Sequence, residues 1–356
     1  MYTLHLASSF SFPPDTYVLD VAHLPTGVAC ITSSQRLALL RPDLKAEARS
    51  ALATHHGNLT ALRVVDAAAG TVCTAGEDGS VSVWDLRRGD AHVARFQAAQ
   101  APITALACDA GSHAIAVGTE LQDHNASIVL WCVSSLGFKP LVYTIVDMMT
   151  RLIWLFRDVR ASPSQKRLYT EVHSDDITEL KFHPKDPNIL LSGSTDGLVN
   201  LCDTRISDED EVVIQTFNHD ASIHHAGFLN DTDVFAISHD ERFAIYSMAE
   251  EQDKGVAIAD FGNVREKIGC QYVANVSAKL DGSGAIIGAG AQDQHLFSLI
   301  HLSKNGPSWE LNTDARVNLP GSHGEEIVRG FSFFDEEQVV YTCGEDGRVN
   351  AWHPGN

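Results

Sequence analysis

Three segments of the chain repeat one local pattern, in which a tight Asp-Gly turn separates two runs of alternating apolar residues. The segments are TAGEDGSVSVWD (Thr74–Asp85), SGSTDGLVNLCD (Ser192–Asp203) and TCGEDGRVNAWH (Thr342–His353). Asp-Gly between alternating runs predicts a β-hairpin, because Gly adopts a positive φ without a steric cost. The chain is therefore expected to build the same hairpin several times.

Two weaker copies lie between the second and third segments. Val234–Met248 has Asp240 in its turn, and Ala285–Leu302 has Asp293. Counted from Asp196 to Asp346, the turn residues follow one another at 44, 53 and 53 residues. This spacing is close to the roughly 40–45 residues of a four-stranded propeller blade, so the hairpins are interpreted as parts of one repeat.

Short alternating runs flank each hairpin, so that each unit supplies four strands. A Trp-Asp pair, Trp84-Asp85, ends the first hairpin. A His precedes the first strand of four units, as His56, His173, His219 and His323. This Gly-His…Trp-Asp layout resembles the WD40-repeat β-propeller family.

The resemblance covers nearly the whole chain and implies an all-β, seven-bladed WD40 β-propeller that forms a single domain over 1–356. Met1–Phe10 alternates, and we expect this N-terminal strand to pair with the last blade and close the ring, because an unpaired edge strand invites aggregation. The expected blades span 17–57, 58–99, 103–172, 177–219, 223–263, 272–323 and 327–355 plus 1–10.

Two segments carry a narrower resemblance. His173–Asp203 and Gly344–Gly355 are similar to the WD repeat-containing protein 89 family, as expected for a fungal member of it. That resemblance implies a propeller without known enzymatic activity. The chain departs from the pattern at Cys202, which replaces the usual Trp, and at Tyr246-Ser247 and Leu302, which carry no Trp-Asp.

The third unit contains an insertion that interrupts the repeat. Trp131 should be followed by Asp, but residues 132–157 intervene before Asp158. Deleting these 26 residues restores a regular repeat, so we hypothesise that 132–157 is a retained intron in the gene model; sequencing the transcript would decide. The alternative is a real hairpin or helical insertion. If translated, this apolar run is expected to project from the third blade or splay its hairpin, and to promote aggregation.

The charge balance narrows the classes of partner. The chain has 26 Lys and Arg against 46 Asp and Glu, a net charge of −20. Direct nucleic-acid binding and adhesion to an anionic membrane both need clustered cations, so neither is expected. Seven cysteines without a Cys-x-x-Cys pair, and an N-terminus without a basic or long apolar run, favour a nuclear or cytoplasmic protein that is not secreted.

We expect no catalytic residue, cofactor or metal. The glycines of 282–290 resemble a dinucleotide loop, but strand-like residues follow where that loop needs a helix. His55-His56 and His224-His225 are poor chelators, because neighbouring residues of a strand face opposite sides. His173 and His323 are expected to hydrogen-bond within their own blades, and the recurring turn Asp residues are explained by turn chemistry.

The function expected is a non-enzymatic scaffold that binds a protein or peptide on the loops around the central channel. Gly-Glu-Asp-Gly in two blades suggests an acidic rim that favours a Lys/Arg-rich partner, the alternative being ordinary solvated turns. A structural subunit that uses the side of the propeller remains open, as does a propeller enzyme. The oligomeric state is not predicted. The candidate partner-binding residues are Glu77, Asp175, Thr195, His239, Arg329 and Glu345.

Overall fold

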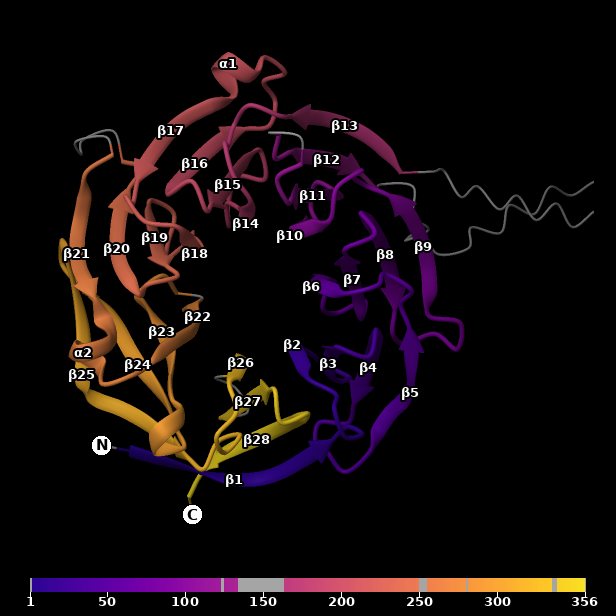
Figure 1. Cartoon of the computed structure of the whole chain (residues 1–356), viewed down its shortest axis with the longest axis vertical. Coiled ribbons are helices and arrows are strands. Elements are labelled where there is room, and N and C mark those ends of the chain that lie inside the picture. The colour runs from indigo at the N-terminus through magenta and orange to yellow at the C-terminus, as the bar shows by residue number, and fades with distance from the viewer. Residues whose placement is uncertain are drawn as a thin grey trace, which may run out of the picture.

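The computed structural model forms a closed ring of antiparallel sheets (Figure 1). It describes residues 2–122, 125–133, 163–249, 255–279, 281–334 and 338–355. Five sheets have four strands each, and an eight-stranded sheet joins the strands of two further blades. The ring therefore has seven blades, as the repeats predicted. No helix in the described ranges is long and apolar enough to cross a membrane.

Each blade is a meander of four strands, numbered here from the innermost strand outwards. Blade 1 consists of β2 (Val18–Leu24), β3 (Gly27–Thr32), β4 (Arg36–Leu40) and β5 (Glu47–Ala53). The next four blades are β6 (Leu59–Asp66), β7 (Thr71–Gly76), β8 (Ser80–Asp85), β9 (His92–Gln97); β10 (Ile103–Asp109), β11 (Ala114–Thr119), β12 (Ile128–Cys132), β13 (Ser164–Tyr169); β14 (Ile177–Phe182), β15 (Ile189–Ser194), β16 (Leu198–Asp203), β17 (Val213–Asn218); and β18 (Ile223–Phe228), β19 (Asp233–Ser238), β20 (Arg242–Ser247), β21 (Ala257–Asn263).

The last two blades share the eight-stranded sheet. Blade 6 consists of β22 (Tyr272–Ala278), β23 (Gly284–Ala291), β24 (Leu296–Asn305) and β25 (Ser308–Pro320), and blade 7 of β26 (Val328–Phe334), β27 (Val339–Gly344), β28 (Arg348–Pro354) and β1 (Tyr2–Ser11). Two short helices, α1 (Glu209–Val212) and α2 (Val264–Ile268), and the 3-10 turn η1 (Gln292–Gln294) lie in loops.

The N-terminal strand closes the ring, which confirms that part of the prediction. β1 pairs antiparallel with β28 from Leu4↔Pro354 to Ser11↔Arg348. Its first residues also pair in parallel with β25 of blade 6, at Tyr2↔Val317 and Thr3↔Asn318. The first and last strands of the chain thus share one sheet (Figure 1).

The Asp-Gly turns have the conformation that the sequence predicted. Gly79, Gly197 and Gly347 follow the turn Asp residues with φ of 70°, 87° and 73°. A side chain at Gly79 would meet the Ala99 carbonyl oxygen at 2.3 Å, so glycine is needed there for space as well as for conformation.

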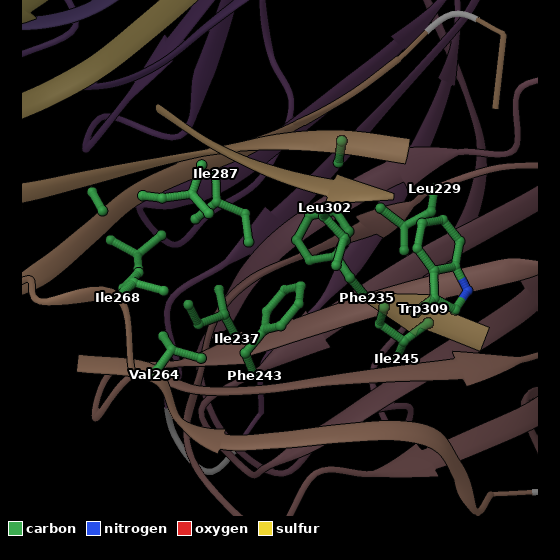
Figure 2. Close-up of a cluster of buried hydrophobic side chains, with 14 residues drawn as sticks. Leu229, Phe235, Ile237, Phe243, Ile245, Val264, Ile268, Ile287, Leu302 and Trp309 are labelled. Atoms are coloured by element: carbon green, nitrogen blue, oxygen red, sulfur yellow. The ribbon is translucent and has the colours of Figure 1, made fainter. Parts of the chain in front are cut away.

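Apolar side chains fill the spaces between neighbouring blades. Figure 2 shows the cluster between blades 5 and 6, in which Phe235, Phe243 and Ile287 are at most 4% exposed. The long β24–β25 hairpin of blade 6 reaches back to blade 5, where Trp309 Nε1 donates to Asp233 Oδ2 at 3.0 Å. Burying each such large side chain stabilises the fold by roughly 1.5–3 kcal/mol.

Threonine hydroxyls link four consecutive blades near the ring axis. Each Thr lies on an innermost strand and donates to the first carbonyl of the next innermost strand. The pairs are Thr60 to Ile103 at 2.6 Å, Thr104 to Ile177 at 2.6 Å and Thr178 to Ile223 at 2.9 Å.

The predicted insertion, 132–157, falls almost wholly outside the described residues. The strands on either side of it are described, and they pair normally from Ile128↔Tyr169 to Cys132↔Ser164. The described part of the β12–β13 hairpin is therefore not splayed.

Candidate functional site

All six candidate residues lie at one end of the ring. The strands of a blade alternate in direction. The loop between the second and third strands of each blade therefore lies at the same end of the ring as the loop that leads to the next blade. We call this end the loop face. Glu77, Thr195, His239 and Glu345 lie in the first kind of loop, Asp175 lies in the second, and Arg329 lies near the start of β26.

A hydrogen-bonded chain of four side chains ties the loop face to the interior of blade 2. Trp84 Nε1 donates to Thr74 Oγ1 at 2.9 Å, and the same hydroxyl lies 3.0 Å from His56 Nε2. His56 Nδ1 lies 3.1 Å from Asp78 Oδ1. Burial lowers the pKa of His56, so the neutral ring donates from Nδ1 to Asp78 and accepts from Thr74 at Nε2.

Blade 7 repeats this chain, and blade 4 repeats most of it. In blade 7, His323 Nε2 lies 2.8 Å from Thr342 Oγ1, to which Trp352 also donates. In blade 4, His173 lies between Ser192 and Asp196 at 2.8 and 3.0 Å, and Cys202 takes the place of Trp. The expectation that His173 and His323 bond within their blades is confirmed.

The turn aspartates are held ionised by these partners. Burial of Asp78 opposes its ionisation, but Ser80, His56 and Arg95 together lower its pKa to about 2. Asp196 and Asp346 behave alike, with burial opposed by His173 and His323 respectively and the pKa lowered in both. Each carboxylate is thus engaged inside its own blade, which fits a structural role.

Four of the candidate residues lie in two local groups: Arg329 and Glu345 contact each other, and Asp175 and Thr195 both bond Asp176. Arg329 makes an ion pair with Glu345 on blade 7. In blade 4, the amide nitrogen of Thr195 donates to the Asp176 carbonyl oxygen at 3.0 Å, and Asp175 accepts from the Asp176 amide at 2.8 Å. The structure therefore places these residues in local groups on separate blades rather than in one cluster.

The other two candidates differ in environment. Glu77 is exposed and accepts a hydrogen bond from Asn58 Nδ2 at 2.6 Å. His239 is exposed and stacks on His224, with ring centroids 4.6 Å apart. Glu77 and Glu345 belong to blades 2 and 7, which flank blade 1 in the ring (Figure 1).

One argument from the sequence is wrong. His224 and His225 were expected to face opposite sides of a strand, but their ring centroids lie 4.1 Å apart. A β-bulge between Ile223 and His225 breaks the alternation and brings both rings to the same side. Even so, no group of three metal-ligating side chains occurs among the residues that the structure places.

A network of charged side chains near the ring axis was not predicted. Arg63 Nη1 lies 3.3 Å from Asp20 Oδ2, and Arg63 Nη2 lies 3.6 Å from Glu179. Glu179 also contacts Lys181 Nζ and His225 Nδ1, each at 3.1 Å. The network joins blades 1, 2, 4 and 5 around the centre of the ring.

Glu179, one of the two acids in this network, stays ionised, whereas burial raises the pKa of the other acid, Asp20. Burial of Glu179 opposes ionisation, but Lys181, His225 and Arg63 hold its pKa well below the usual range. A carboxylate held ionised in this way is a weak general acid or base near neutral pH, so Glu179 is better explained as a link between blades. Its sequence signal was the charged residues in otherwise apolar runs, ITELKF and LTALRV.

The two ends of the ring differ in charge. In the described loops of the loop face, Arg265 and Lys267 are the only Lys or Arg residues. The loops at the opposite end contain both acidic and basic residues. Their basic residues are Arg41, Lys45, Arg87, Arg88, Lys185, Arg205 and Lys279. The carboxylates of the loop face are Asp15, Glu77, Asp78, Glu120, Glu171, Asp175, Asp176, Asp196, Asp220, Asp240, Glu241, Glu266, Asp293, Glu325, Glu326, Glu345 and Asp346.

Three arginines of the strands neutralise part of this charge. Arg95 pairs with Asp78, Arg329 with Glu345, and Arg348 lies 3.8 Å from Asp346. Exposed carboxylates with no cationic partner among the described residues remain around the ring: Asp15, Glu77, Glu120, Glu171, Asp220, Asp240, Glu266, Asp293 and Glu326. The loop face is therefore a negatively charged surface.

Comparison with known proteins agrees with this architecture. Residues 164–203 match the family model described as WD domain, G-beta repeat. An uncharacterized WD repeat-containing protein of Saccharomyces cerevisiae is 32% identical over 81% of this chain, and the match spans 65% of that protein's length. A second, from Schizosaccharomyces pombe, is 30% identical over 83% of each chain.

The narrower resemblance is also supported. The WD repeat-containing protein 89 homolog of Dictyostelium discoideum is 23% identical over 51% of this chain and 49% of its own length. The seven four-stranded blades, the His–Asp networks and the similarity to both yeast proteins lead to one conclusion: the chain belongs to the family of WD repeat-containing β-propeller proteins.

Proposed function

We propose that this propeller is a protein-interaction scaffold whose loop face binds a Lys/Arg-rich segment of a protein partner. WD repeat proteins are typically protein-interaction scaffolds, which supports the class of function. The kind of partner is inferred from the charge of the loop face, where exposed carboxylates without cationic partners extend over all blades. A basic segment would gain favourable electrostatic energy along the whole ring.

The experiment is a binding measurement with a synthetic Lys/Arg-rich peptide and the full chain. Reversing two charges of the loop face, by Glu77→Lys together with Glu345→Lys, is expected to weaken binding on the order of tenfold at physiological salt. Binding by the unmodified chain should also fall as salt is raised, because the contacting charges are exposed.

A matched control tests whether position matters or only net charge. Asp90 and Asp281 are exposed residues in loops at the opposite end of the ring, so Asp90→Lys with Asp281→Lys changes the net charge equally. This variant should bind within about twofold of the unmodified chain. Equal weakening by both double variants, or no weakening by the first, would refute the proposal.

The alternative of a structural subunit that uses the side of the propeller predicts one large apolar patch on the outer strands. Among the described residues, exposed large apolar side chains lie on several separate blades: Tyr2 and Leu6 on β1, Tyr17 in the loop before β2, Leu168 on β13 and Ile214 on β17, with Val256 next to β21. This scatter favours the loop face over the side as the principal binding surface.

A further inference from the structure

A groove lies between blades 2 and 3, on the outer side of the ring near the loop face. Its volume is about 420 Å³, within the range of roughly 300–1,000 Å³ that ligand-binding clefts occupy. Trp131 and Val129 of β12 and Leu168 of β13 supply its apolar surface, and the loop 98–101 forms the wall on the side of blade 2. Leu168 is 48% exposed.

The groove exists because blade 3 lacks side chains that fill the same place in blade 2. In blade 2, Thr74, Ser82 and Arg95 lie side by side across the second, third and fourth strands. The equivalent residues of blade 3 are Val117, Val129 and Leu168, in the same order.

In blade 2, Arg95 lies over the loop face and donates to Ser80 Oγ at 3.0 Å and to the carbonyl oxygen of His55 at 2.7 Å. It also pairs with Asp78. Leu168 makes none of these bonds, and the loop 98–101 before blade 3 has no His. The polar contacts that cover this part of blade 2 are therefore missing in blade 3.

The lining of the groove is uncharged. No Lys, Arg, Asp or Glu occurs among the described residues that form it, although charged residues make up 20% of the chain. Five exposed carboxamides line it instead: Gln97, Gln100, Gln122, Asn125 and Gln165. Gln97 Nε2 donates to the carbonyl oxygens of Asp78 and Ala99, whereas the side chains of Gln100, Gln122 and Gln165 form no hydrogen bond to a described residue. Each carboxamide can both donate and accept.

We propose that this groove binds an extended, uncharged peptide segment of a partner protein, at a site separate from the acidic loop face. An extended backbone presents alternating N–H and C=O groups, which carboxamides can pair with on either side. One apolar side chain of the peptide rests on Trp131 and Leu168. The absence of charge favours a neutral segment, because a charged one would lose its hydration without gaining an ionic partner.

The test uses a displayed library of nine-residue peptides built from uncharged residues, selected on the full chain. Selected peptides should bind Leu168→Arg on the order of tenfold more weakly, because the substitution restores the blade 2 side chain and covers the apolar surface. Binding should change the tryptophan fluorescence of the unmodified chain, and Trp131→Phe should remove that change.

Two further variants keep the result interpretable. Ile214→Arg places the same charge on β17, at a side chain that is 43% exposed, and should leave the affinity within about twofold. Gln122→Ala with Gln165→Ala probes the groove without adding a charge and should weaken binding on the order of fivefold. This variant replaces Leu168→Arg if Leu168→Arg fails to fold.

The loop-face variant Glu77→Lys with Glu345→Lys should leave binding to the groove unchanged. Peptides that bind all variants equally, or a library that yields no binder sensitive to the groove substitutions, would overturn the proposal.

Discussion

Blades 2 and 3 have the same four-stranded architecture but hold their loop-face ends in different ways. In blade 2, the indole of Trp84 is 4% exposed and donates to Thr74, which continues to His56 and Asp78. In blade 3, Val117 takes the place of Thr74, and Trp131 Nε1 donates instead to the carbonyl oxygen of Ala98 in the preceding loop at 3.1 Å.

The difference shows that the polar chain is not required to form a blade. Blade 3 pairs its strands as fully as blade 2 does, and both contribute to one apolar cluster that includes Val83, Ile103 and Ile115. Strand pairing and burial between blades therefore build the ring, and the polar chain adds stability and covers the loop-face end where it is present. Where it is absent, a groove remains.

The largest expected effect comes from breaking the chain in blade 2. Thr74→Val keeps the shape of the side chain but leaves the Trp84 N–H without an acceptor and His56 Nε2 without a donor. Since both groups are buried, the free energy of unfolding should fall by about 3 kcal/mol. Urea denaturation would measure this.

The matched variant in blade 3 sharpens the comparison. Val117→Thr adds a buried hydroxyl at a position where neither a His ring nor a Trp N–H can bond it. The free energy of unfolding should therefore fall by about 1 kcal/mol rather than rise. A Thr74→Val variant as stable as the unmodified chain would contradict the role assigned to the polar chain.

Blade 5 offers the next largest effect, because it buries an acid without completing such a chain. Glu241 is 5% exposed and its Oε2 has no hydrogen-bond partner among the described residues. Burial raises its pKa from 4.5 to about 7. The unfolded chain ionises near 4.5, so ionisation of Glu241 weakens the folded state progressively as pH rises from about 4.5 to 7.

Glu241→Gln should therefore stabilise the protein on the order of 2 kcal/mol at pH 8 and have little effect at pH 4. Thermal unfolding across this pH range would measure the difference between variant and unmodified chain. A gain that is the same at both pH values would assign the effect to something other than ionisation.

A smaller effect is expected at Asp78, whose folded-state pKa of about 2 lies below the usual 3.8. The ionised carboxylate stabilises the fold above about pH 4, and this stabilisation is lost as pH falls from about 4 towards 2. After allowance for its partial exposure, Asp78→Asn should cost about 1 kcal/mol at pH 7 and reduce the acid sensitivity of unfolding. Denaturant titrations at pH 7 and pH 3 would test both statements.

The smallest effect follows from making blade 3 more like blade 2. Trp84 pairs with His92 across seven intervening residues, 85–91. Trp131 pairs with Gln165, and with residues 132–157 removed seven residues, 158–164, would separate them. The excised chain should fold with unchanged blade pairing and gain about 1 kcal/mol from the shorter loop. Failure of the excised chain to fold would show that the insertion is needed.

The sequence predicted the ring well because its signals are local and repeated. Alternating apolar runs recur in every blade, a preceding His in four and an Asp-Gly turn in three, so each copy supports the others. The closing role of the N-terminal strand followed from the same logic. The prediction that His224 and His225 face apart failed, because a bulge depends on how β18 pairs with β19 and leaves no mark in the two residues themselves.

The sequence by itself determined the repeating strand and turn pattern, the acidic balance and the places where the repeat weakens, since all of these depend on neighbours along the chain. Only the tertiary structure decided which residues meet across blades, such as Arg63 with Glu179 and Trp309 with Asp233, and where an uncharged groove remains between blades 2 and 3. Closing the ring fixes the distance between neighbouring sheets, and that distance, rather than any local preference, brings these side chains together or leaves space between them.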